Sequence, residues 1–303
     1  MAAPVIRRLP IVLAPRVTWW HGWAPLVMMP GGVLLFAPST WPAWAVMWTL
    51  AFTIYAGCKW LTWRRTPLDG VPRWRHAAYL LAWPGLDAAA FLSAPVTRSP
   101  AAREWISGAA LFACGVALLF GAARLIAPQH PAVAAWVGMI GIVLTLHFGI
   151  FRVLSCGWRA LGVEARPLMD RPLASVSLSE FWGRRWNTAF RDLTHRFLFR
   201  PLTTRVGARW AILGGFVFSG LVHELVISVP AAGGYGAPTI FFTLQAIGML
   251  VERTGVGRRI GLGQRWSGWA FAMFVLVAPV YLLFHPPFVG RIVLPFMRAL
   301  RAM

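Results

Sequence analysis

A histidine and a glutamate stand side by side in one of the chain's apolar stretches. Residues 209–230 read RWAILGGFVFSGLVHELVISVP, which is about the length of roughly 20 residues that crosses a bilayer as a helix. His223 and Glu224 lie past its middle. An ionisable side chain at the bilayer centre costs roughly 2.5–3.5 kcal/mol or more, so such residues usually face a cavity or a partner. A neutral histidine there could act as a general base, or it could hydrogen-bond to a neighbouring helix.

A second group of suggestive residues lies in the loop before this stretch. Residues 171–202 read RPLASVSLSEFWGRRWNTAFRDLTHRFLFRPL. Ser177 and Glu180 have capping-box spacing, which predicts that a helix begins there. The arginines and aromatic residues that follow have the composition of a basic helix at a membrane surface. An anchor on anionic lipid would explain that composition, but it leaves Asn187 unexplained.

Together the two groups resemble a known family. FWGRRWN at 181–187, followed by the apolar SGLVHE at 219–224, is similar to the plant-type wax synthase branch of the membrane-bound O-acyltransferases (MBOAT). SLSE at 177–180 and FRPL at 199–202 fit the same pattern. The order and spacing of the two main motifs are specific, whereas the His-Glu pair alone would be a weak signal.

The resemblance extends over about 171–252, and elsewhere it rests on hydropathy. It implies a single integral-membrane acyltransferase domain over 1–303, with 171–252 as the core that carries the motifs. The implied reaction transfers a fatty acyl group from acyl-CoA to a long-chain alcohol, giving a wax ester and free CoA. The expected partners are acyl-CoA, a lipophilic alcohol and membrane lipid, and no nucleic acid.

The resemblance also assigns the catalytic residues. His223 matches the family's catalytic histidine, which would take the proton of the alcohol during attack. Asn187 matches the asparagine of the first motif, and its amide would hold the thioester carbonyl or the developing oxyanion, or else orient His223. Because a thioester is already activated, no metal or other cofactor is expected, and acyl-CoA is a co-substrate.

Other motif residues are candidates for contact with substrate. Arg184 and Arg185 could pair with CoA phosphates through forked hydrogen bonds, or with lipid headgroups. Trp182 and Trp186 fit packing against the membrane or the core better than they fit a substrate contact.

The helix that carries His223 has further candidates. Ser219 shares the face of His223, whereas Glu224 points about 100° away and could pair with an arginine of the loop or be structural. Gly220 removes bulk on the same face, which allows close helix packing or a lipid tunnel. His147, in another apolar run, is expected to be buried and hydrogen-bonded. Gln245 is expected to form a hydrogen bond between helices, or it could line the site.

The composition indicates a polytopic membrane protein. Of 303 residues, 58% are hydrophobic and 13% charged, with a mean hydropathy of +0.63, whereas a soluble domain has about 25% charged residues. The formal net charge is +20. The arginines lie mostly between apolar runs, which fits cytoplasmic loops under the positive-inside rule. Three isolated cysteines indicate neither a disulfide framework nor a zinc site.

The apolar runs predict an all-α protein with about eight membrane spans. The expected spans are 24–38, 41–57, 105–126, 133–151, 210–230, 237–251, 267–285 and 287–298. The segment 77–95 is expected to be re-entrant or interfacial, because another crossing would put the arginine-rich loop 152–209 on the wrong side. Asp87 in that segment is a second candidate for a buried acid. The membrane is expected to be of the bacterial inner type, with the arginine-rich loops cytoplasmic.

Two kinds of alternative follow from the residues. Within the family, the acceptor could be a sterol, diacylglycerol or another hydroxyl compound. A transporter would instead carry paired charges on several spans along a path, and a structural membrane protein would tolerate the loss of His223. The ionisable pair His223–Glu224 lies in one span near a basic helix, which favours an enzyme.

Overall fold

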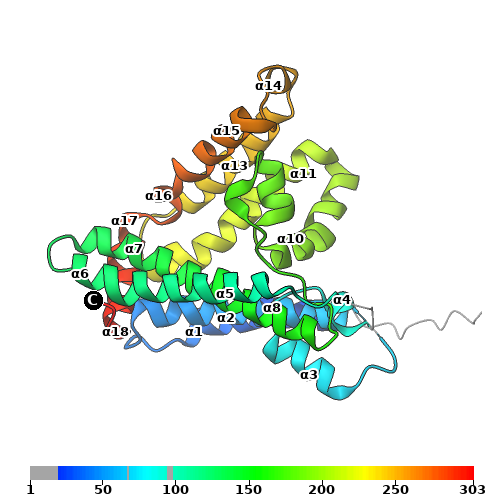
Figure 1. Ribbon diagram of the computed structural model, residues 1–303, viewed down its shortest axis with the longest axis horizontal. Helices are drawn as coiled ribbons and strands as arrows, with labels where there is room; N and C mark the ends of the chain where they lie inside the picture. The colour runs from blue at the N-terminus through cyan, green and yellow to red at the C-terminus, as the bar shows by residue number, and fades with distance from the viewer. Residues whose placement is uncertain (1–19, 67, 94–97) are drawn as a thin grey trace, which may run out of the picture.

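Helices make up every regular element that the structure describes. The computed structural model describes residues 20–66, 68–93 and 98–303. Within these ranges it contains α, π and 3-10 helices and no strand, so the all-α prediction is confirmed. The helices form two groups that meet at an angle (Figure 1).

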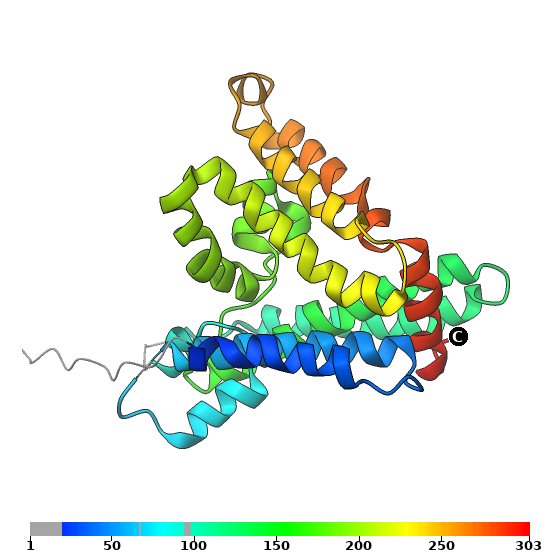
Figure 2. The same cartoon turned by 180° about the vertical axis from the view of Figure 1, so that it is seen from behind.

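The first group is a layer of long helices that run along one another (Figure 2). Helix α1 packs against α2, and the segment from α5 to α6 packs against the segment from α7 to α8. The bounds are α1 (Trp20–Phe36), α2 (Ala43–Arg64), α5 (Ala102–Val116), η1 (Ala117–Ala122), α6 (Ala123–Ile126), α7 (Pro131–Val143), η2 (Leu144–Ile150) and α8 (Phe151–Ala160).

The second group carries the motifs. Here α11 and α15 both pack against α13, and Gln245 on α13 donates to the Val275 carbonyl 2.8 Å away, as expected for a polar residue between helices. The bounds are η3 (Pro172–Ala174), α9 (Leu178–Glu180), η4 (Phe181–Arg185), α10 (Thr188–Thr194), η5 (His195–Phe199), α11 (Arg200–His223), η6 (Glu224–Ser228), α12 (Val229–Ala231), α13 (Ala237–Glu252), α14 (Gly255–Arg259), α15 (Arg265–Val277) and α16 (Val280–Leu283).

The chain then returns to the first group through α17 (Pro286–Phe288), η7 (Val289–Val293) and α18 (Leu294–Ala299). Phe288, Ile292 and Met297 pack in one apolar cluster with Ala134 of α7 and Ile227 of η6. This cluster fixes the end of the His223 segment to the first group of helices.

Four described helices are long and apolar enough to cross a membrane: Ala102–Ile126, Pro131–Ala160, Thr188–Ala231 and Arg265–Leu283. Two further apolar helices, Gly22–Phe36 and Ala237–Glu252, are shorter. Five of the eight predicted spans lie wholly or largely within these six helices at 24–38, 105–126, 133–151, 210–230 and 237–251, and a sixth, 267–285, overlaps the last long one. Integral-membrane character is therefore supported by length and composition.

The described part of the segment 77–95, residues 77–93, does not form one long helix, and residues 94 and 95 lie outside the described residues. It is divided between α3 (Arg73–Ala82) and the short α4 (Ala88–Leu92). The ten residues of α3 rise about 15 Å, half of a hydrocarbon core of about 30 Å. The prediction that Asp87 is a buried acid is wrong, because its side chain is exposed and caps α4 by accepting from the Ala90 N–H at 3.0 Å.

A sharp bend separates the basic arm of α11 from its apolar part. Gly207 has φ 81° and ψ 163° inside α11, a backbone conformation that is essentially restricted to glycine. The residues before it continue α10 and η5, and the residues after it lead to His223. Gly207 therefore sets the angle between the arginine-rich arm and the apolar part of α11.

Replacing Gly207 with alanine should lower stability by about 1–3 kcal/mol, because the new side chain is strained in that conformation. Gly215 is the matched control, since it is helical and a Cβ there would meet nothing within 4 Å. We expect Gly215→Ala to unfold at or above the wild-type temperature in detergent. Equal unfolding temperatures for the two variants would contradict the assigned bend.

Candidate active site

His223 ends α11, at the start of the π-helical segment η6. Its Nδ1 lies 2.7 Å from the carbonyl oxygen of Ser219, one turn earlier. A carbonyl oxygen can only accept, so Nδ1 carries the proton of the neutral ring and Nε2 is left as the acceptor. The residue is half-buried, and its ring centroid lies 4.4 Å from that of Phe242 on α13. The geometry thus leaves Nε2 able to take a proton.

The ring of Trp182 belongs to the same cluster. Its centroid lies 5.8 Å from that of Phe242 and 5.6 Å from that of Phe216, in an edge-to-face arrangement with Phe216. Phe216 lies on α11 two turns before His223. The fold therefore brings a residue of the FWGRRWN motif to the rings that surround His223, although the two are far apart in sequence.

Trp186, the second tryptophan of the motif, stacks between Phe181 and His147. The centroid distances are 5.5 Å to Phe181 and 6.4 Å to His147, with interplanar angles of 12° and 16°. His147 lies in the π-helical segment η2. Its Nδ1 is buried and has no hydrogen-bond partner among the described residues, so the hydrogen bond expected for His147 is not found at this nitrogen.

Asn187 occupies a left-handed turn. Its φ is 43°, and its side-chain oxygen accepts from the Phe190 N–H at 3.5 Å, which caps α10. Its own N–H points to the sulfur of Met169 at 3.2 Å. Asparagine tolerates this conformation and is a preferred N-cap, so the turn gives it a structural role. None of the hydrogen bonds found for Asn187 reaches His223.

Two carboxylates, those of Glu180 and Glu252, hold the short helix α9, which leads into FWGRRWN. Ser177 accepts from the Glu180 N–H at 2.9 Å, so the predicted helix start is confirmed. Burial raises the pKa of the Glu180 carboxyl, but the Val176 N–H and the Arg185 guanidinium hold it below its usual value. The buried carboxylate of Glu252 accepts from the Leu178 N–H at 2.5 Å. It also accepts from the next N–H, that of Ser179.

Sequence reasoning missed this role of Glu252. It stands at the end of an apolar run beside an arginine, which is also the pattern of a simple boundary residue. Its partners lie more than 70 residues earlier, so no local spacing indicates them. Only the folded chain shows that the end of α13 carries the start of the motif.

Glu224 joins the other end of α13 to the His223 helix. Its Oε1 accepts from the N–H and the hydroxyl of Thr239, at 3.1 and 3.0 Å. Beside it, a Cβ on Gly220 would lie 2.6 Å from the Cα of Thr239, so α11 and α13 are in close contact there. Of the two roles left open for Glu224, the structural one fits, and Gly220 serves packing.

The two motif arginines differ in their surroundings. Arg185 forms an ion pair with Glu180 at 2.7 Å and donates to the Asp170 carbonyl at 3.2 Å. Its guanidinium is therefore already engaged within the loop. Arg184 is exposed and is the better placed of the two for a phosphate or a headgroup.

A serine–histidine pair elsewhere has the wrong polarity for nucleophilic catalysis. His285 Nδ1 accepts from the Phe288 N–H at 3.2 Å, so its proton is on Nε2, which donates to the Ser228 hydroxyl 3.2 Å away. A base would have to accept from that hydroxyl instead. Among the described residues there is also no group of three or more His, Cys, Asp or Glu that could hold a metal ion.

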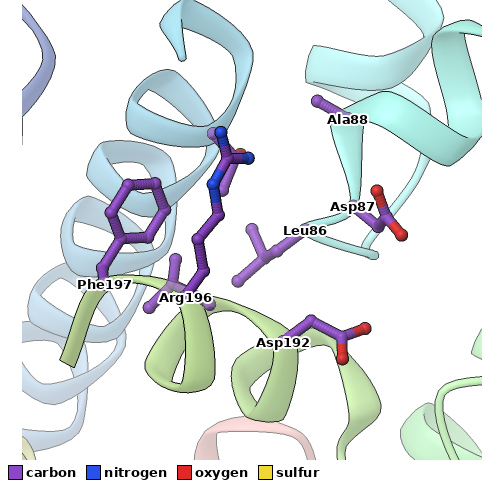
Figure 3. A pocket seen from close by; sticks show the side chains of 8 residues that line it. Leu86, Asp87, Ala88, Asp192, Arg196 and Phe197 are labelled. Carbon is purple, nitrogen blue, oxygen red and sulfur yellow. The ribbon is translucent and has the colours of Figure 1, made fainter. Parts of the chain in front are cut away.

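Two cavities lie away from His223. One, of about 150 Å³, is lined by Asp87, Asp192 and Arg196 among others. Figure 3 shows Arg196 extending away from Asp192, and its guanidinium donates to the carbonyl of Arg65, the residue after α2, at 3.0 Å. The other, of about 420 Å³, is an apolar hollow between α13 and α15–α16. Neither is lined by His223.

Comparison with known proteins finds a family match over part of the chain. Residues 165–244 match the membrane bound O-acyl transferase family. This stretch contains both FWGRRWN and His223, so the resemblance predicted from the motifs is confirmed.

Similar proteins in plants carry names that specify the reaction more closely. A long-chain-alcohol O-fatty-acyltransferase of Simmondsia chinensis is 32% identical over 129 residues, which are 39% of this chain and 37% of the relative. A probable long-chain-alcohol O-fatty-acyltransferase 9 of Arabidopsis thaliana is 30% identical over 116 residues, 35% of this chain and 33% of the relative. Acyl-CoA–sterol O-acyltransferase 1 of the same plant is 34% identical over 71 residues, 21% of each chain. The aligned stretch thus spans less than two fifths of each of these relatives.

Removing the Glu252 carboxylate should loosen the motif from α13. Glu252→Ala leaves the N–H groups of Leu178 and Ser179 without an acceptor, at about 1–3 kcal/mol for each buried group. We expect a clear fall in unfolding temperature in detergent. Glu164→Ala is the control, since the Arg166 partner of Glu164 is largely exposed and such ion pairs are worth about 0–1 kcal/mol. A Glu252→Ala variant as stable as the control would contradict the assigned contact.

Proposed function

We propose that the protein is an acyl-CoA-dependent O-acyltransferase that forms wax esters from long-chain alcohols. One observation carries the proposal. The family match over 165–244 contains His223, and the fold brings that histidine to the ring cluster of the motif in the same match. The names of the relatives support a long-chain alcohol as the acceptor of a fatty acyl group.

In the proposed reaction His223 is the general base. Its Nε2 takes the hydroxyl proton while the alcohol oxygen attacks the thioester carbonyl, a contribution typically worth about 10²–10⁴-fold. The new C–O bond forms, the C–S bond breaks, and the proton passes to the CoA sulfur. No metal and no covalent enzyme intermediate enter this scheme.

Other motif residues are proposed to assist. Asn187 holds the thioester carbonyl or orients His223, and its place at the α10 cap supports a fixed position for its amide. Arg184 contacts CoA phosphates or lipid headgroups, whereas Arg185 is assigned to the ion pair with Glu180. Trp186 and Ser219 shape the site, since Trp186 stacks on His147 and Ser219 holds the ring of His223.

The proposed setting is a single domain over 1–303, with its core at 171–252 and about eight spans. Four long and two shorter apolar helices support a multi-pass protein. We place the arginine-rich loops on the cytoplasmic side of a bacterial-type inner membrane, following the positive-inside rule.

A sterol is the second candidate for the acceptor. The similarity to an acyl-CoA–sterol O-acyltransferase favours it, because the name of that relative specifies acyl transfer from acyl-CoA to a sterol. Diacylglycerol or another hydroxyl compound would fit the same base. A transporter finds no support among the relatives.

Ester formation tests the proposal directly. Membranes that contain the protein should convert labelled acyl-CoA and a long-chain alcohol into ester and free CoA, and a panel of alcohols and sterols would identify the acceptor. We expect His223→Ala to lower turnover by at least 10²-fold. His195→Ala, at an exposed histidine of the arm, should not. If His223→Ala and wild type behave alike with every acceptor, His223 is not the base.

The amide of Asn187 can be tested apart from its cap. Asn187→Asp keeps a residue type that tolerates the left-handed turn and caps helices, but the aspartate side chain has no N–H group to donate. We expect normal expression and unfolding temperature, with ester formation lowered by at least 10-fold because an oxyanion donor is lost. Full activity of this variant would leave Asn187 with the structural role only.

A further inference from the structure

The indole N–H of Trp182 is a buried donor with no acceptor among the described residues. Buried polar groups are nearly always hydrogen-bonded, so an exception calls for an explanation. An indole nitrogen can only donate. A partner for it must therefore bring a hydrogen-bond acceptor into the ring cluster.

Several other tryptophans donate a hydrogen bond from their indole N–H. Trp158 donates to the Ala82 carbonyl at 3.1 Å, Trp269 to the Leu173 carbonyl at 2.9 Å, and Trp63 to His76 at 3.0 Å. Trp48 also has a buried N–H without a partner, but it lies on α2 and packs against Phe296. Trp182 is distinguished by its contact with Phe242, the ring that covers His223.

The two polar groups of the cluster are complementary. Nε2 of His223 is an acceptor, and it suits a hydroxyl group that has a proton to lose. The Trp182 N–H is a neutral donor, and it suits a carbonyl oxygen. The rest of the cluster consists of the rings of Phe216, Phe242 and Phe181, which suit hydrocarbon chains.

We propose that the Trp182 indole N–H binds the carbonyl oxygen of the acyl thioester and strengthens that bond as the oxygen becomes negative. The inference rests on the proposed acyl transfer. It adds a donor to the amide of Asn187, and a tetrahedral oxyanion accepts more than one donor. Trp182 is then a catalytic residue rather than a packing residue.

Trp182→Phe separates this role from packing. The change removes the N–H and keeps an aromatic ring, and loss of one oxyanion donor typically costs about 10²–10³-fold in turnover. We expect at least a 10-fold fall in turnover. Deleting a buried N–H that has no partner removes a desolvation penalty, so the loss of hydrogen bonding itself should not lower the unfolding temperature. Trp48→Phe deletes the same kind of group elsewhere and should keep full activity.

An isosteric change covers the case in which the smaller ring disturbs packing. Benzothienylalanine, in which sulfur replaces the indole N–H, can be incorporated at position 182 by codon suppression. We expect the same fall in turnover with the wild-type unfolding temperature. Wild-type turnover in this variant would overturn the proposal.

Binding of substrate analogues identifies the oxygen involved. Hexadecanoyl-CoA and S-hexadecyl-CoA differ at the thioester carbonyl, which is a methylene group in the thioether. Wild type should prefer the thioester, and the preference should fall several-fold toward unity in Trp182→Phe. An unchanged preference would show that the N–H serves another oxygen and would overturn the assignment. A wild-type protein that binds neither and forms no ester would refute the proposed function itself.

Discussion

Helix α13 is held by a carboxylate at each end, and the candidate site depends on this. At its first turn Glu224, the neighbour of His223, accepts from Thr239. At its last residue Glu252 accepts from the first turn of the motif segment. Carboxylates bind such free N–H groups strongly, because the helix N-terminus has unpaired donors and a partial positive charge. Both α11, which carries His223, and the segment that leads into FWGRRWN are thereby fixed to α13.

Between these two contacts the aromatic rings determine the separation of the groups. Phe242 on α13 touches His223 on one side and Trp182 on the other. Each aromatic pair adds about 0.5–1.5 kcal/mol to the energy gained from the area that it buries. The row of rings therefore stabilises the packing of this part of the protein.

The motifs were readable from sequence because their signals are local. The capping spacing of Ser177 and Glu180 predicted a helix start that the structure contains, and the match with the acyltransferase family follows from short motifs in a fixed order. Long apolar runs likewise predicted helices. What could not be read is pairing across distance. The partners of Glu252 and Glu224 lie on other segments, and the exposure of Asp87 depends on a break after α3.

The number of spans was harder to predict from hydropathy, because the apolar runs do not begin and end at the same residues as the helices. The arginine-rich arm before Gly207 continues into the apolar helix that carries His223, so one helical region, Thr188–Ala231, includes both a basic segment and a candidate span. Conversely, the run 77–95 is apolar enough to resemble a span, but Pro84 and Gly85 lie in the non-helical stretch between α3 and α4. Periodicity and mean hydropathy do not distinguish these cases.

An experimental structure with bound hexadecanoyl-CoA, determined without an alcohol so that no turnover occurs, would test the central claim most directly. We expect the thioester to lie in the ring cluster, with its carbonyl oxygen within hydrogen-bond distance of Trp182 and its carbon near Nε2 of His223. A thioester bound elsewhere, with the His223 ring facing only lipid chains, would contradict the proposed active site.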